Sequence, residues 1–298
     1  MGGQVERLSE IEFRKHSTTS AQDRAKAEVI VIERLEDYLA IEDILELAAL
    51  DDPFEGLVTD HIESFDAVDE LANELRKEWK LGTDPIPSMT ALLEGKGIKV
   101  IEEPLPERFD GLACHVSWSG EKPPVHAVVV SSRTNIERKR FNLSHELAHR
   151  VIRATGNPNV GLEKAMNRFA GAFLVPAEHL FDEVGIPRHK ITYPEIMRLK
   201  RFYGVSAAAM LMRLEQVGIL SRAVIQYAFR TYARSWRTAE PEPFRDEEGF
   251  GAFERPQRFE SLVWRALGEE LISPVRAAQL LRLTLSTVER EIRGSRGQ

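Results

Sequence analysis

Most of the apolar positions in this 298-residue chain recur at helical spacing. Residues 21–50 predict one long amphipathic helix, and a second helix is expected near 66–81. Helices are predicted again from 136 to 235. Between these helical regions, three short apolar runs predict β-strands: residues 98–101, 112–118 and 126–131. The pattern therefore predicts an α+β fold that is mostly helical, with a small three-stranded sheet.

Turn-forming residues divide the chain into units. The stretch 238–257 is rich in proline, glycine and acidic residues, which is typical of a linker. A short helical pattern follows it. We therefore predict four segments: a helical N-terminal extension at 1–64, a central domain at 65–237, the linker at 238–257 and a small helical unit at 258–298.

The clearest chemical signal is the run HELAH, from His145 to His149. Two histidines four residues apart on a helix project from the same face, so both can bind one metal ion. Neutral imidazoles suit Zn²⁺, and Glu146 lies on the adjoining flank, where it can accept a proton from an attacking water. Either Asn142 or Ser144 is a candidate cap for the start of this helix.

A catalytic zinc needs a third protein ligand and an open coordination position. The segment 156–161 can reverse the chain, so that the apolar helix predicted at 162–175 lies beside the HELAH helix. Glu163, at the start of that second helix, is the predicted third ligand. A glutamate at this place is also favoured by the helix dipole without any metal. Three residues are alternative ligands: Glu178, His179 and Asp182.

Two stretches, 140–149 (RFNLSHELAH) and 163–176 (EKAMNRFAGAFLVP), resemble the ImmA/IrrE metallopeptidases. The resemblance implies a zincin-like core in which the two motif histidines and Glu163 bind Zn²⁺. It also implies that Glu146 is the catalytic base. In weaker form the resemblance extends from about Arg14 to Ile292.

The sequence departs from the family pattern at two places. Ala148 stands where the family usually has glycine, and Ala165-Met166 stands where it commonly has Glu-Ala. The second change removes an acidic residue from near the site. We still expect zinc binding, although a retained zinc site can be catalytic or structural.

The resemblance implies a zinc-dependent endopeptidase that cleaves a regulatory protein, such as a DNA-binding repressor, in stress or mobile-element control. The alternative is a DNA- or protein-binding transcriptional regulator, or an antitoxin-like module, whose zinc site is structural or sensory. In the peptidase, the substrate backbone is expected to pair with the exposed edge of a strand such as 126–131. Three residues are candidates for stabilising the oxyanion: Tyr193, Tyr203 and Arg168.

Members of this family are often fused behind an XRE-type helix-turn-helix domain. Residues 13–50 resemble the connector that follows such a domain, and the residues ahead of them are too few to form it. We therefore expect DNA recognition to belong to a separate regulator that this protein cleaves or binds.

The net charge of −7 conceals two oppositely charged blocks. Fourteen acidic residues and no lysine or arginine lie between Glu36 and Leu75, whereas Arg188 to Arg237 holds ten basic residues and two acidic ones. The acidic block is a candidate dock for a basic partner, and the basic block is a candidate DNA contact. Both blocks can instead be solvated helical faces that pair with each other.

The stretch Ser273–Arg293 fits a helix-turn-helix. Ser273 followed by proline is a good helix start, and Arg282 occupies the turn, where a left-handed backbone favours glycine. Three residues fit the packing positions: Ala278, Leu283 and Val288. Two glutamates in the second helix weaken attraction to phosphate, so packing on the main domain or binding a protein is the alternative to reading DNA.

The single cysteine, Cys114, excludes an internal disulfide and favours a reducing cytoplasm. No apolar run is long enough to cross a bilayer. We therefore expect a cytoplasmic protein. Cys114, beside His115, can be interpreted as a latent ligand that blocks the zinc, or as an ordinary buried apolar cysteine.

Overall fold

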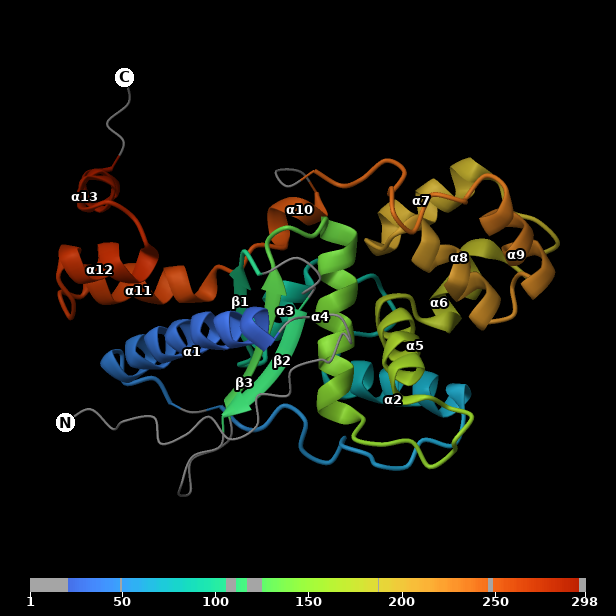
Figure 1. Ribbon diagram of the computed structural model, residues 1–298, viewed down its shortest axis with the longest axis horizontal. Helices are drawn as coiled ribbons and strands as arrows, with labels where there is room; N and C mark the ends of the chain where they lie inside the picture. Colours follow the sequence, from blue (N-terminus) through green and yellow to red (C-terminus); the bar gives the residue numbers. More distant parts are fainter. Residues whose placement is uncertain are drawn as a thin grey trace.

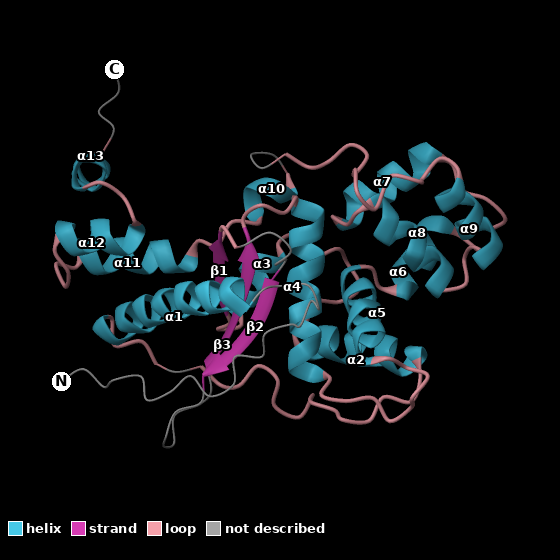
Figure 2. Cartoon of the chain, viewed as in Figure 1, coloured by secondary structure: helices cyan, strands magenta, loops and turns pink. Residues whose placement is uncertain are grey.

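The structure is a computed structural model that describes residues 21–48, 50–105, 111–116, 125–186, 188–245 and 249–294. Its strands are β1 (Lys99–Glu103), β2 (Gly111–Val116) and β3 (Val125–Ser131). Its helices are α1 (Ala21–Ile44), α2 (Phe65–Glu78), α3 (Met89–Gly95), α4 (Ile136–Val151), α5 (Leu162–Leu174), α6 (Ala177–Val184), α7 (Tyr193–Tyr203), α8 (Ala207–Gln216), α9 (Arg222–Arg230), α10 (Phe250–Phe253), α11 (Arg258–Gly268), α12 (Pro274–Leu281) and α13 (Leu285–Arg293). The predicted α+β class with mostly helical content is confirmed (Figure 2).

The sheet has the strand order β1-β3-β2, with β1 parallel and β2 antiparallel to β3. Lys99 aligns with Ala127 on one side of β3, and His115 aligns with His126 on the other. Because β3 is the central strand, both of its edges already carry a neighbour. The choice of strand 126–131 as the example for substrate pairing is therefore wrong, because the outer edges of the sheet belong to β1 and β2. Pairing of substrate with a strand edge stays a prediction.

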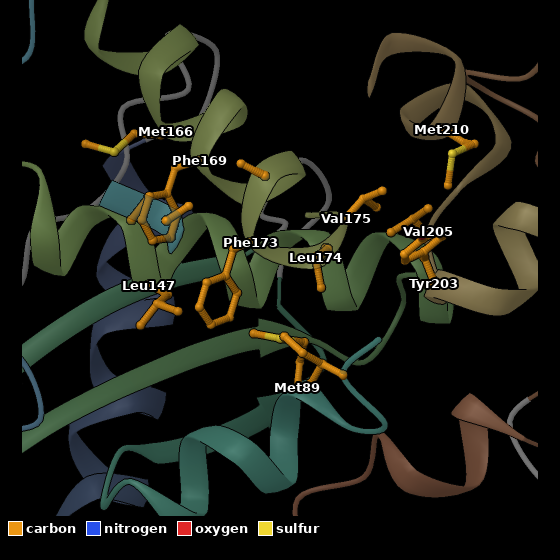
Figure 3. Close-up of a cluster of buried hydrophobic side chains, with 14 of the residues drawn as sticks. Met89, Leu147, Met166, Phe169, Phe173, Leu174, Val175, Tyr203, Val205 and Met210 are labelled. Carbon is orange, nitrogen blue, oxygen red and sulfur yellow. The ribbon is translucent and has the colours of Figure 1, made fainter. Parts of the chain in front are cut away.

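Helix α4 lies between the sheet and helix α5 (Figure 1). Leu143, Leu147 and Val151 are completely buried on one face of this helix, and the helix as a whole contacts both α5 and the sheet. Phe169 and Phe173 on α5 stack with ring centroids 5.7 Å apart and form the core with Leu147 (Figure 3). This packing on two sides fixes the helix that carries the HELAH run.

Helices α6 to α9 form the side of the molecule beyond α5 (Figure 1). A buried lysine, Lys200 on α7, joins this side to α4 through Glu137 and also pairs with Glu240 at 3.0 Å. Five serines cap the starts of described helices, because the side chain of each accepts a hydrogen bond from a backbone N–H group: Ser64, Ser88, Ser206, Ser221 and Ser273. Such caps satisfy donors that the first helical turn leaves unpaired.

The segment predicted as a linker, 238–257, lies against the central domain at several points. Glu254, at the end of α10, is completely buried and pairs with buried Arg140 of α4. It also accepts hydrogen bonds from the backbone N–H groups of Met89, at 2.8 Å, and Thr90, at 3.0 Å. The segment 238–257, which we call the strap, is therefore packed against the central domain although its composition is typical of a linker.

The two ends of the described chain share a second hydrophobic core. Tyr38 and Ile41 of α1 pack with residues of α11, α12 and α13, among them Val263 and Val288. Arg34 of α1 donates to the backbone carbonyl of Leu280 at 3.1 Å. The predicted N-terminal extension and C-terminal unit thus form one helical body beside the sheet (Figure 1).

The C-terminal unit has the local geometry expected of a helix-turn-helix. Ser273 caps α12, and Arg282 adopts a left-handed backbone with φ 55° between α12 and α13. Val288 is buried as predicted, whereas Leu283 is exposed. Arg282 pairs with Glu103 of β1 at 3.1 Å, so the turn faces the sheet.

Several residues of the acidic block pair within the chain. Asp37 lies 3.4 Å from Arg276, and Glu42 lies 2.8 Å from Lys99. Asp69 joins the acidic block to the basic one through Arg213, at 2.9 Å. These carboxylates therefore pair with basic residues of the same chain, which is the alternative to an acidic dock for a basic partner. Among the described residues, no helix is long and apolar enough to cross a membrane.

Candidate metal centre

The HELAH run occupies the second half of α4. The helix begins at Ile136, where the side chain of Asn135 accepts a hydrogen bond from the backbone N–H of Arg138 at 2.9 Å. The prediction that Asn142 or Ser144 caps this helix is wrong, because both lie buried inside it. The earlier start gives two further turns of helix, which anchor the motif against the sheet.

Helix α5 brings the predicted third ligand to the two histidines. Glu163 lies in its first turn, and its side chain is 64% exposed. The Nε2 atom of His145 lies 3.8 Å from Oε2 of Glu163, and the rings of His145 and His149 are 5.2 Å apart. Each of the three residues offers a ligand atom within 4.8 Å of the other two. This is the only such group found in the described part of the chain.

A residue that the sequence analysis missed orients His145. The side-chain oxygen of Asn167 lies 2.9 Å from Nδ1 of His145. Since that oxygen only accepts hydrogen bonds, Nδ1 carries the hydrogen and Nε2 keeps its lone pair for a metal. Asn167 follows Glu163 by four residues, and this spacing places both on one face of α5. The same spacing rule that identified the histidine pair would have found it.

The donor set fits Zn²⁺. Two imidazoles and one carboxylate from three residues match the ligands of a catalytic zinc site, and three protein ligands leave a position open. The missing acidic residue at Ala165 does not alter this set. Ala165 is about 200° around the helix from Glu163 and is completely buried in the core.

Glu146 lies next to this group on α4. Its side chain is 1% exposed, while His145 is 2% exposed. A glutamate beside two metal-binding histidines is suited to exchange protons with a water at the site. The arrangement of His145, His149 and Glu163, with Glu146 beside them on α4, is therefore compatible with the roles predicted for these four residues.

The family comparison agrees with this geometry. The model of the peptidase family described as IrrE N-terminal-like domain, Peptidase_M78, matches residues 93–215. The resemblance to the ImmA/IrrE family is confirmed. This family consists of metallopeptidases, and the matched segment contains Glu146 and the three candidate ligands His145, His149 and Glu163. The match is narrower than the span of Arg14 to Ile292 that the sequence predicts. No curated protein matches the chain.

A cavity of about 420 Å³ opens beside the ligands of the M78 domain. His145, Glu163 and Asn167 form one wall of it, and Phe141 and Trp236 are among the other lining residues. Two further lining carboxylates, Glu137 and Glu240, are both held by Lys200. Burial raises the pKa of Glu240, although the hydrogen bond from the Ala207 backbone and the charge of Lys200 oppose this shift.

The three candidates for oxyanion stabilisation do not line this cavity. Tyr203 is buried, and its hydroxyl is 2.8 Å from Nδ1 of His179. Arg168 is bound to Asp69 at 2.7 Å, and Tyr193 donates to Glu242 at 3.1 Å. The structure therefore gives these three side chains other partners.

The remaining predictions concern residues outside the M78 ligand group. The alternative ligands Glu178, His179 and Asp182 all lie on α6, and none of them is part of the group formed by the two histidines and Glu163. His126 lies 3.1 Å from Asp52. The side chains of Cys114 and His115 lie outside the described residues, and the latent-ligand interpretation remains a prediction.

Proposed function

We propose that this chain is a cytoplasmic, zinc-dependent endopeptidase of the ImmA/IrrE type that cleaves a regulatory protein, such as a DNA-binding repressor, in stress or mobile-element control. The observation that carries the proposal is the convergence of His145, His149 and Glu163 beside buried Glu146. A helix that carries the motif and packs on a small sheet supports a zincin-like core. The match to a metallopeptidase family supports the reaction class.

His145, His149 and Glu163 would hold the metal, and other side chains of this chain would transfer the protons and orient the ligands. A bound Zn²⁺ supplies Lewis-acid polarisation of a water and of the scissile carbonyl. Glu146 accepts a proton from the attacking water and later delivers it to the leaving amine. Asn167 holds the ring of His145 in one tautomer, through the 2.9 Å contact with Nδ1. The low exposure of Glu146 limits competing water.

The alternative is a regulator with a structural or sensory zinc, acting through Ser273–Arg293 or the block Arg188–Arg237. The geometry of α13 weighs against DNA reading by the first segment. Arg290 lies 4.0 Å from Glu291, and Arg293 lies 3.9 Å from Glu289. These acidic neighbours reduce the attraction of α13 to phosphates.

Two measurements in sequence test the proposal. Metal analysis of the wild-type protein should give one zinc per chain, and His149→Ala and Glu163→Ala should lower the bound zinc. Incubation of the zinc-loaded protein with the regulator encoded next to it should then produce two fragments. Stoichiometric binding without cutting, or duplex binding that weakens steeply with salt, would favour the alternative.

A further inference from the structure

A second hollow lies next to the cavity beside the ligand group. This second hollow, of about 470 Å³, runs along α8 and α9. Arg237 lines both hollows, so they meet at its side chain. We treat the two hollows, which share Arg237, as one surface that extends from His145 along α8 and α9. We call this surface the α8–α9 groove.

Unpaired positive charge dominates the second part of the groove. Arg222, Arg230 and Arg237 are exposed, and none of them pairs with a carboxylate of the described residues. The guanidinium of Arg237 rests on the ring of Phe229 at 4.5 Å, which holds it in place without neutralising it. Glu215 is the one acidic side chain among the residues that line this part.

The first part of the groove holds a small opposing charge, because Lys200 balances one of the two carboxylates that it contacts there. Glu137 and Glu240 line it, but both are held by the buried Lys200. Glu163 belongs to the metal ligands. Part of the excess positive charge of the block Arg188–Arg237 therefore lines the α8–α9 groove, which ends at the ligand group.

Apolar side chains separate the arginines. Met212, Ile225 and Phe229 line the second hollow, and Phe141 and Trp236 line the first. Binding to a duplex phosphate backbone rests on positive charge and makes no use of such apolar lining. A peptide chain presents charged and apolar side chains together, and both kinds are accommodated here.

We propose that the α8–α9 groove binds an acidic segment of the substrate protein that also carries apolar residues. The inference rests on the proposed function and names its substrate class. The carboxylates of the segment pair with Arg222, Arg230 and Arg237, while its apolar side chains occupy the hollows between them. Binding there delivers the neighbouring peptide bond to His145 and Glu146.

The test uses the full chain carrying Glu146→Gln and loaded with zinc, so that binding is measured without cleavage. The probes are two fluorescent twelve-residue peptides, one alternating Asp/Glu with Leu/Phe and the other with Lys in place of each acidic residue. Fluorescence anisotropy should show about tenfold tighter binding of the acidic peptide. That preference should shrink as salt is raised, because exposed charges are screened.

Two double variants locate the binding surface. Arg230→Glu with Arg237→Glu should weaken binding of the acidic peptide about tenfold without changing Tm. The control, Arg290→Glu with Arg293→Glu on α13, makes the same charge change away from the groove and should leave binding unchanged. Equal affinity for both peptides, or equal losses in the two double variants, would overturn the proposal.

Two further outcomes separate this inference from the proposed function. A twelve-nucleotide DNA strand that displaces the acidic peptide and loses affinity in the Arg230/Arg237 variant would assign the groove to nucleic acid and overturn the inference. Selective binding of the acidic peptide by a chain that cuts no regulator would support the groove while refuting the peptidase. Cleavage without any charge preference would refute the groove alone.

Discussion

Removal of the Glu254 carboxylate should strongly destabilise the protein. Both members of the Arg140–Glu254 pair are completely buried. Glu254→Ala leaves the charge of Arg140 without its carboxylate and the backbone N–H groups of Met89 and Thr90 without an acceptor. Loss of one partner of a buried ion pair costs about 3–5 kcal/mol. With an unfolding entropy of about 2.1 cal/mol/K per residue, that loss corresponds to a fall in Tm of roughly 5–8 °C for a chain of this size.

Thermal unfolding of three variants measures this effect. Glu254→Gln keeps the size of the side chain and one acceptor oxygen, so its loss should lie between those of wild type and Glu254→Ala. Glu269→Ala is the control, because it removes an exposed partner of Arg265 and should cost less than about 1 kcal/mol. If Glu254→Ala melts no lower than Glu269→Ala, the strap 238–257 does not contribute to the core as described.

Three further changes test the ligand group and the helices around it. Asn167→Ala should lower zinc affinity about 10–100-fold in a competition titration with a chelating dye, because His145 loses the acceptor that orients its ring. The control, Lys164→Ala on the same helix, should bind zinc as tightly as wild type. Gly204→Ala should lower the free energy of unfolding by at least about 1–2 kcal/mol in denaturant, because φ is +67° and the new Cβ would lie 2.7 Å from Nε of Arg140. Gly161→Ala is the control, since its new Cβ meets no atom within 4 Å and should be tolerated. Equal denaturation midpoints of the two variants would contradict this reasoning. The hydrogen bond from Arg188 is the main reason why the pKa of Glu195 is lowered to about 2, so the ionised carboxylate stabilises the fold above about pH 4.5 and this stabilisation is lost as the pH falls toward 2. The Tm difference between wild type and Glu195→Gln should therefore shrink over that range. A difference that stays constant would exclude a stabilising role of the Glu195 carboxylate.

Local patterns predict the ligand group and most elements of the fold. The four-residue spacing of His145 and His149 needs only a helix, and the apolar face of α5 with the turn before it is enough to bring Glu163 close. The runs that predict strands become β1, β2 and β3, because each is a short segment that contains apolar and β-branched residues. These features depend on neighbours in the sequence.

Features that depend on distant residues are not visible in such patterns. The hydrogen bond from Arg34 to Leu280 spans 246 positions, so nothing local indicates that α1 and α12 share a core. Glu254 lies in a segment whose composition indicates a linker, and its burial depends on Arg140 at a separation of 114 residues. The order of the strands likewise follows from tertiary pairing, which is why the central position of β3 was missed.

The central claim is that Glu146 performs proton transfer in peptide hydrolysis at a metal held by His145, His149 and Glu163. The most direct test compares the zinc-loaded wild type with Glu146→Gln, at equal metal content, on the regulator encoded next to this protein. Intact-mass measurement should give two fragments from the wild type whose masses sum to that of the regulator plus one water, and uncut regulator from Glu146→Gln. Equal cleavage by both proteins would contradict the role of Glu146, and no cleavage by either would contradict the assignment as a peptidase of this regulator.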